Sequence, residues 1–194
     1  GSELALQAQL PSPYRLAVFF KHEDFPNRPA LQRVDWVSAD ADRVQRALAP
    51  VQEEGILQQS FLLANSTVQG TTLRDIRLAA ARYNADALLI IDGASAVERY
   101  NNGHAAWYTT GIGAYSAHGT ESHALFMMEG TLWDVRTGYL YGTQTAEGET
   151  TLIGPAPSLE DRTAVAEAKD VALERFSKEL AEMLRLLREK QKPA

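Results

Sequence analysis

Cysteine is absent from this chain of 194 residues, so the chain forms no disulfide and no thiolate metal site. The absence leaves the cellular compartment open, because many proteins of the bacterial envelope also lack cysteine. No apolar run approaches the roughly 20 residues that a helix needs to span a bilayer. The net charge is −6, so the basic surface expected of a nucleic-acid binder is missing too. These absences argue against a disulfide-stapled scaffold and against nucleic acid as a partner.

The motifs of common enzyme classes are missing as well. No Gly-x-Ser-x-Gly sequence is present, so the chain has no nucleophile elbow of the α/β-hydrolase type. Gly111-Ile112-Gly113 lacks the third glycine and the strand-to-helix context of a dinucleotide site, and favours a bend in a long strand. Adjacent carboxylates such as Glu53-Glu54 are typical of solvated faces. We therefore predict that the chain is not an enzyme and that it binds no cofactor.

One globular domain accounts for the composition, in which 45% of the residues are hydrophobic and 23% are charged. Gly1-Ser2 resembles the remnant left by removal of a purification tag, and Pro11-Ser12-Pro13 favours a linker. We expect residues 1–13 to form this remnant and linker, residues 14–190 a single α/β domain, and residues 191–194 a tail. A signal peptide or a lipid-bearing cysteine would then precede Glu3 in the natural protein.

The first half of the chain begins with the pattern of a strand and a helix. The apolar run Tyr14–Lys21 predicts a buried strand, and residues 22–35, which carry two prolines, predict an irregular loop. Helical periodicity begins near Asp40, with Ser38 or Asp40 itself as the N-cap. We expect this helix to cover one face of the first strand.

Proline and glycine mark the end of this first helix. Pro50 is expected to kink or split it, and Gly55 is a suitable stop. A second strand is predicted over Leu57–Leu63. Thr72 and Asp75 then form a capping-box pattern, which predicts the start of a second helix.

This second helix leads into the most apolar segment of the chain. Asn84 can end the helix in the left-handed conformation. The continuous apolar run Ala87–Asp92, ended by Gly93, predicts a central strand that is covered on both faces. The first half therefore reads β-α-β-α-β. One face of the second helix is expected to carry the following residues: Leu73, Ile76, Ala80 and Tyr83.

The second half predicts an antiparallel meander. Asn101-Asn102-Gly103 is a strong hairpin signal between predicted strands at 95–100 and 104–110. Another strand is predicted over 111–117, followed by a turn at His118-Gly119-Thr120. The chain then enters the hairpin described next.

The clearest local signal is the segment Asp134–Gly138, which lies between two apolar stretches within Ala124–Gln144. Gly138 can take the positive φ that closes a tight turn. Asp134 can accept hydrogen bonds from the amides of the turn, and Thr137 can support the same geometry. This pattern predicts a hairpin of two strands.

A long C-terminal helix completes the predicted fold. Ser158 is its expected N-cap, with Asp161 at the third position. We predict an α/β domain: β-α-β-α-β, then an antiparallel meander, then this helix, all packed on one mixed sheet of six or seven strands. The apolar face of the helix is expected to carry the following residues: Val165, Ala168, Ala172, Phe176, Leu180, Leu184 and Leu187.

Three histidines in the predicted meander leave metal binding open as an alternative. His104, His118 and His123 have Glu121 nearby, and these side chains can supply nitrogen and oxygen ligands. His118 and His123 are five residues apart, which matches no standard zinc spacing. Exposed turn and strand histidines are the simpler interpretation, so we predict no metal. A domain that binds a metal or a small molecule through this region stays the alternative function.

Aromatic residues concentrate in the same predicted meander. Tyr100, Trp107, Tyr108 and Tyr115 are candidates for a partner-binding surface, because Trp and Tyr are enriched at interface hot spots. Cross-strand packing beneath the C-terminal helix is the simpler interpretation of the aromatic residues in the meander. Both interpretations hold together if alternate residues point to opposite faces of the sheet.

Several segments resemble those of bacterial envelope lipoproteins. The segments are YRLAVFF at 14–20, LAAARYNADALLIIDG at 78–93, and Asp134-x-Arg136-Thr137-Gly138 before a closing helix. Their order is similar to that in the group of the curli-secretion lipoprotein, the penicillin-binding-protein activator lipoproteins and the N-terminal domain of TolB. A narrower similarity, carried by Gly113-Ala114-Tyr115, is to rhombotarget lipoproteins.

The resemblance implies a non-enzymatic lipoprotein domain in the periplasm. It implies a lipid anchor in the outer membrane, attached outside this sequence, as the only membrane contact. The expected partner is another envelope protein, in an accessory or assembly role, and a homo-oligomer is a further expectation. The pore-forming segments of curli-type secretion have no match in this chain, and no catalytic residue carries over.

Overall fold

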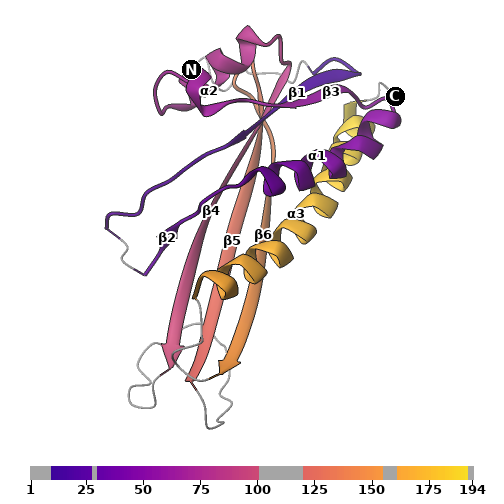
Figure 1. The fold of residues 1–194 in the computed structure, drawn as a ribbon. Helices are drawn as coiled ribbons and strands as arrows, with labels where there is room; N and C mark the ends of the chain where they lie inside the picture. Colours follow the sequence, from indigo (N-terminus) through magenta and orange to yellow (C-terminus); the bar gives the residue numbers. More distant parts are fainter. Residues whose placement is uncertain (1–9, 28–29, 101–119, 155–160, 192–194) are drawn as a thin grey trace.

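The structure is a computed structural model that describes residues 10–27, 30–100, 120–154 and 161–191. Strands and helices alternate in the first half, and long strands followed by one long helix make up the second (Figure 1). The elements are β1 (Tyr14–Phe20), β2 (Gln32–Arg33), α1 (Ser38–Glu53), β3 (Leu57–Leu62), a 3-10 turn (Asn65–Thr67), α2 (Leu73–Arg82), β4 (Ala87–Tyr100), β5 (Thr120–Asp134), β6 (Leu140–Gly154) and α3 (Asp161–Gln191).

A mixed six-stranded sheet connects these elements. Its strand order is β3-β1-β4-β5-β6, with the short β2 paired to β4 off this path. β1 runs parallel to both β3 and β4, as the two β-α-β crossovers require. β4, β5 and β6 are antiparallel neighbours. The predicted α/β fold with a β-α-β-α-β half and a meander is therefore confirmed.

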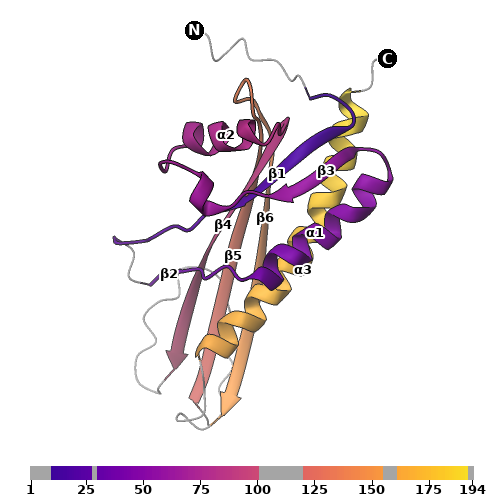
Figure 2. The same cartoon turned by 45° about the horizontal axis from the view of Figure 1, so that its top comes forward.

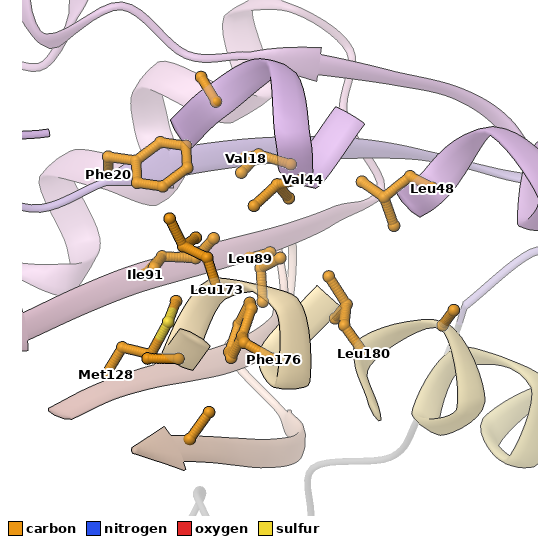
Figure 3. Packing of buried hydrophobic residues seen from close by; sticks show 14 of the residues in the cluster. Val18, Phe20, Val44, Leu48, Leu89, Ile91, Met128, Leu173, Phe176 and Leu180 are labelled. Carbon is orange, nitrogen blue, oxygen red and sulfur yellow. The ribbon is translucent and has the colours of Figure 1, made fainter. Parts of the chain in front are cut away.

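Helices cover both faces of the central strands. Leu89 and Ile91 of β4 face α1 and α3 in the larger core, which Figure 3 shows from close by. Leu88 and Ile90, the alternate residues, face α2 in the smaller core. Side chains alternate between the two faces of a strand, so a strand buried on both faces must be apolar throughout. The run at Ala87–Ile91 meets this requirement.

The ends of α1 differ from the prediction. Val37, and not Ser38 or Asp40, is the N-cap, and the Asp40 carboxylate accepts a hydrogen bond from the Val37 amide at 2.9 Å. Pro50 does not split the helix, which continues to Glu53. Pro50 lies in the last turn, where its missing N–H removes a single bond near an end that frays in any case. Gly55 follows the helix with a φ of 69°, as expected.

The start and the end of α2 agree with the prediction. Thr72 caps the helix, since its hydroxyl accepts a bond from the Asp75 amide and the Asp75 carboxylate accepts one from the Thr72 amide. Asn84 takes the left-handed conformation just after the helix, with a φ of 55°. Of the predicted apolar face, Ile76 and Ala80 are buried, whereas Tyr83 is exposed.

β4 continues beyond the predicted end at Gly93 and runs to Tyr100. β5 pairs with β4 from Ala87 to Tyr100. The backbone groups of β4 beyond Gly93 therefore find hydrogen-bond partners on β5, so the strand does not end there. The far halves of β4, β5 and β6 therefore extend past β1 and β3 as a three-stranded arm (Figures 1 and 2). The short strand β2 is a second difference, because it lies in the segment predicted as a loop.

α3 packs along one face of this arm with its predicted apolar stripe. Two glycines of the sheet permit α3 to lie close to β5 and β6. A Cβ on Gly148 would lie 2.0 Å from the backbone oxygen of Ala168, and one on Gly130 would lie 2.4 Å from the Phe176 ring. The helix therefore sits closer to β5 and β6 than side chains at these positions would permit.

Candidate functional site

The hairpin between β5 and β6 is held by a buried carboxylate. Asp134 accepts bonds from the amides of Arg136 (2.9 Å) and Thr137 (2.7 Å), and from the Tyr141 hydroxyl (2.6 Å). Gly138 closes the turn with a φ of 76°, as predicted. Arg77 of α2 donates to two carbonyls of the turn, those of Val135 and Arg136. This geometry satisfies the carboxylate completely, so the turn is a structural feature and not a reactive site.

Hydrogen bonding lowers the pKa of Asp134. Burial alone would raise it, but the bonds from Thr137, Tyr141 and Arg136 stabilise the charged form more strongly. Because the folded pKa lies below the unfolded one, the carboxylate adds stability above about pH 4 and loses it as the pH falls further.

Replacing Asp134 with Asn is therefore expected to lower the free energy of unfolding at pH 7 by about 1–3 kcal/mol. The difference between wild type and variant should shrink below about pH 4, where the wild-type carboxylate takes up its proton. Urea unfolding at pH 7, 4 and 3 measures both effects. Asp42→Asn, at an exposed position on α1, is the matched control. A difference that stays constant with pH would contradict the role of the charge.

The face of the arm opposite α3 is the candidate functional surface. Side chains of β4, β5 and β6 form rows across it, because directly paired residues point to the same face. Its centre is apolar, and α2 covers only the part near Leu88 and Ile90. Within the described residues, no helix packs on the rest of this face. The rows are Asp92–Glu129–Thr145, Ala94–Met127–Glu147, Ala96–Leu125–Glu149 and Glu98–His123–Thr151.

This open face is strongly acidic at its rim. Five carboxylates lie around the apolar centre, and the segments 87–98, 123–134 and 140–152 contain no lysine or arginine. On the β4 side, Arg33 of β2 pairs with Ala94 and therefore lies on the same face. Asp92 is the half-buried carboxylate of the five, and both burial and repulsion from other carboxylates change its pKa. The pKa of Asp92 is raised mainly by burial and further by Glu23 and Glu129, although Lys21 opposes this. The carboxylates are Asp92, Glu98, Glu129, Glu147 and Glu149.

Sequence reasoning missed these carboxylates as a group. Glu147 and Glu149 were visible as an acidic pair, but their alignment with Glu129 and Glu98 depends on the register of three strands. The available signal was the absence of lysine and arginine from residues 87–98, 123–134 and 140–152. That absence indicates a face that repels acidic molecules and attracts basic ones.

Most of the predicted partner-binding aromatics lie outside the described residues. Trp107, Tyr108 and Tyr115 are in this group. Tyr100 ends β4, paired with Glu121, but its side chain is not among those described. The role of all four residues stays a prediction. The hairpin and strands predicted over 101–117 also lie outside the described residues.

Other aromatics of the meander pack within the sheet, in line with the simpler interpretation. Tyr141 packs against the larger core and contacts Tyr139, with ring centroids 5.3 Å apart. Trp133 packs against the smaller core, and its indole N–H donates to the Thr131 hydroxyl at 2.8 Å. Packing against the two cores therefore accounts for Tyr141 and Trp133, and the ring of Tyr139 packs on that of Tyr141.

Of the three histidines in the metal alternative, one has a described side chain. His104 and His118 lie outside the described residues, as does the side chain of Glu121. His123 is half-buried on β5, and its Nδ1 lies 2.9 Å from the Thr151 hydroxyl. Over the described ranges, no group of three His, Asp or Glu side chains is arranged to hold a metal ion. In the same ranges, no helix combines the length and apolarity needed to cross a membrane.

Comparisons with known proteins find structural likeness at low sequence identity. No family model matches the chain. No curated protein matches it. The chain is similar to the solved structure of a minor lipoprotein from Acinetobacter baumannii, with 9% identity over 92% of this chain and 96% of that chain, and a TM-score of 0.45.

Two further solved structures are similar in the same way. A lipoprotein from Neisseria meningitidis shares 14% identity over 84% of this chain and 98% of that chain, with a TM-score of 0.35. The PelC dodecamer from Paraburkholderia phytofirmans shares 14% identity over 91% and 93%, with a TM-score of 0.36. The specific resemblance to the curli-secretion group stays a prediction from the sequence.

Proposed function

We propose that this chain is the non-enzymatic domain of a bacterial envelope lipoprotein and that it binds another envelope protein through the open face of the arm. The observation that supports this most directly is the apolar centre formed by Ala94, Ala96, Leu125 and Met127, which carboxylates flank. Ala94 is buried, whereas Ala96, Leu125 and Met127 are partly exposed. Partly exposed apolar side chains within a polar rim are typical of protein interfaces.

The charge of the rim defines the partner. An acidic face with five carboxylates, and with Arg33 of β2 as a cation beside Ala94, fits a protein that presents a mainly basic surface around a few apolar residues. The sequence resemblance supports a location in the periplasm, with a lipid anchor in the outer membrane attached upstream of Glu3. The proposal has no role for a cofactor or a metal.

The aromatic residues Trp107, Tyr108 and Tyr115 belong to the same proposal. They lie in the sequence between Tyr100, which ends β4, and Thr120, which begins β5. Trp and Tyr are the side chains that protein interfaces most often use as anchors.

Replacing Leu125 and Met127 together with Ser is expected to abolish partner capture from envelope extracts and to weaken binding of the purified partner at least tenfold. The loss of apolar contact at the centre of the face is the physical reason. Raising the salt concentration should weaken binding of the wild type, because the rim attracts the partner electrostatically. Pull-down followed by calorimetry measures both effects, and circular dichroism confirms folding.

The matched control replaces Leu62 and Leu78, which are exposed but lie on β3 and α2, with Ser. These changes should leave capture unaltered. A third variant, with Trp107 and Tyr108 replaced by Ala, tests the aromatic segment. If the Leu125 and Met127 variant retains its partner, the open face is not the binding surface.

A further inference from the structure

β6 ends the sheet with a long unpaired edge. Its 15 residues pair with β5 on one side, and no described strand pairs with the other side. An edge strand of this length presents a row of backbone N–H and C=O groups that can pair with another chain. The edge therefore offers a second kind of contact beside the open face.

Side chains, and not a strand, contact this edge. The Thr145 carbonyl accepts a bond from the side-chain amide of Gln144 at 3.1 Å, and the Glu147 carbonyl accepts one from Arg175 at 3.3 Å. Backbone groups alternate in direction along an antiparallel strand. The N–H and C=O groups of Thr145, Glu147 and Glu149 therefore point away from β5.

α3 forms a wall beside the edge. The close approach at Gly148 brings the helix backbone against β6. A hollow of about 250 Å³, open to solvent, lies at this place, lined by Glu147, Glu149, Val171 and Arg175. Val171 is an exposed apolar side chain on α3. An edge strand beside a helix wall is an arrangement that accepts an added peptide strand.

Charge decides between a second copy of this chain and a different partner. If two copies paired β6 edges antiparallel about Glu147, the two Glu147 side chains would lie directly opposite, and like charges in that position destabilise a sheet. A strand with basic side chains at every second position would instead place two of them opposite Glu147 and Glu149. The charge of the edge therefore favours a basic partner strand.

We propose that the partner supplies an extended segment with alternating basic residues, which adds to β6 as an antiparallel strand. This inference rests on the proposed function and specifies its mode of contact. The basic side chains lie on the open face, opposite the carboxylates of Glu147 and Glu149. The intervening side chains are apolar and meet Val171 on the α3 side.

A nine-residue peptide of alternating lysine and valine is the probe. We expect it to bind the full chain and to slow hydrogen exchange at the amides of Thr145, Glu147 and Glu149, measured by NMR. Replacing Glu147 and Glu149 together with Lys should weaken binding at least tenfold. Replacing Asp42 and Glu53, which are exposed on α1, together with Lys is the matched control and should leave binding unaltered.

Two methylated peptides separate strand addition from simple charge attraction. In an antiparallel pair, the residue opposite Glu147 shares its face and turns its own N–H toward β6. N-methylation of the lysines therefore removes the bonds to β6 and should abolish binding, whereas N-methylation of the valines should not. Equal binding of the two peptides, or the reverse order, would overturn the proposal.

The two proposals fail in different ways. If partner capture depends on Leu125 and Met127 but the peptide does not bind, strand addition is wrong and the protein-binding function stands. If the peptide binds as expected but the variant with Leu125 and Met127 replaced still captures the partner, the open face is not the surface that the partner binds.

Discussion

Replacing Phe176 with Ala is expected to lower the free energy of unfolding by about 3–5 kcal/mol, the usual cost of deleting a buried aromatic side chain. Phe176 is fully buried where α3 crosses the sheet, among the side chains that Figure 3 shows. Its ring lies directly over Gly130 of β5. The substitution leaves a cavity that the rigid sheet cannot close. Urea unfolding followed by circular dichroism measures the loss.

The control on the same helix is Leu186→Ala, because Leu186 is 56% exposed. It should change the free energy by less than about 0.5–1 kcal/mol. A double-mutant cycle with Gly130→Ala tests the contact itself. Gly130→Ala alone should destabilise, since its Cβ would meet the Phe176 ring, but it should cost less when Phe176 is already Ala. Additive effects would show that the two residues do not share this space.

Replacing Asp40 with Ala is expected to cost about 3 kcal/mol, because it leaves a buried cation without its partner. The Lys169 ammonium lies 2.8 Å from the Asp40 carboxylate, and the side chains are 13% and 5% exposed. Lys169 also donates to the Asp35 carbonyl at 3.2 Å. This ion pair joins the start of α1 to α3, so its loss affects two helices. Thermal and urea unfolding measure the change.

A second ion pair between the same helices is the matched control. Arg43 and Asp170 are 3.2 Å apart, but their side chains are 37% and 60% exposed. Asp170→Ala should therefore cost less than about 1 kcal/mol. Replacing Asp40 with Ala and Lys169 with Met together should recover part of the loss, since no buried charge then lacks a partner. If the double variant is as unstable as the sum of both single variants, the pair is not coupled.

Features that depend on neighbouring residues were predictable from the sequence. The turn at Asp134–Gly138 is one, because its hydrogen bonds connect residues two to seven positions apart. The capping box at Thr72 is another. The apolar stripe of α3 follows from helical periodicity alone.

Features that depend on distant residues were not predictable in this way. The cap of α1 differs from the prediction because Asp40 is positioned by Lys169, 129 residues along the chain, as well as by the Val37 amide. β4 continues beyond Gly93 because β5 pairs with it there and provides hydrogen-bond partners for its backbone. The site shows the same division: the sequence indicated the meander as the candidate surface, but the acidic rows require the register of β4, β5 and β6.

By itself, the sequence determined the kinds and the order of the main elements, though not the short strand β2, and which side chains of each main element are apolar. These follow from turn chemistry and from the periods of helix and strand, which act over a few residues. The tertiary structure alone decided which face of the arm α3 covers and which face stays open with its carboxylates. An alternating pattern distinguishes two faces of a strand, but only long-range pairing and packing assign a neighbour to each.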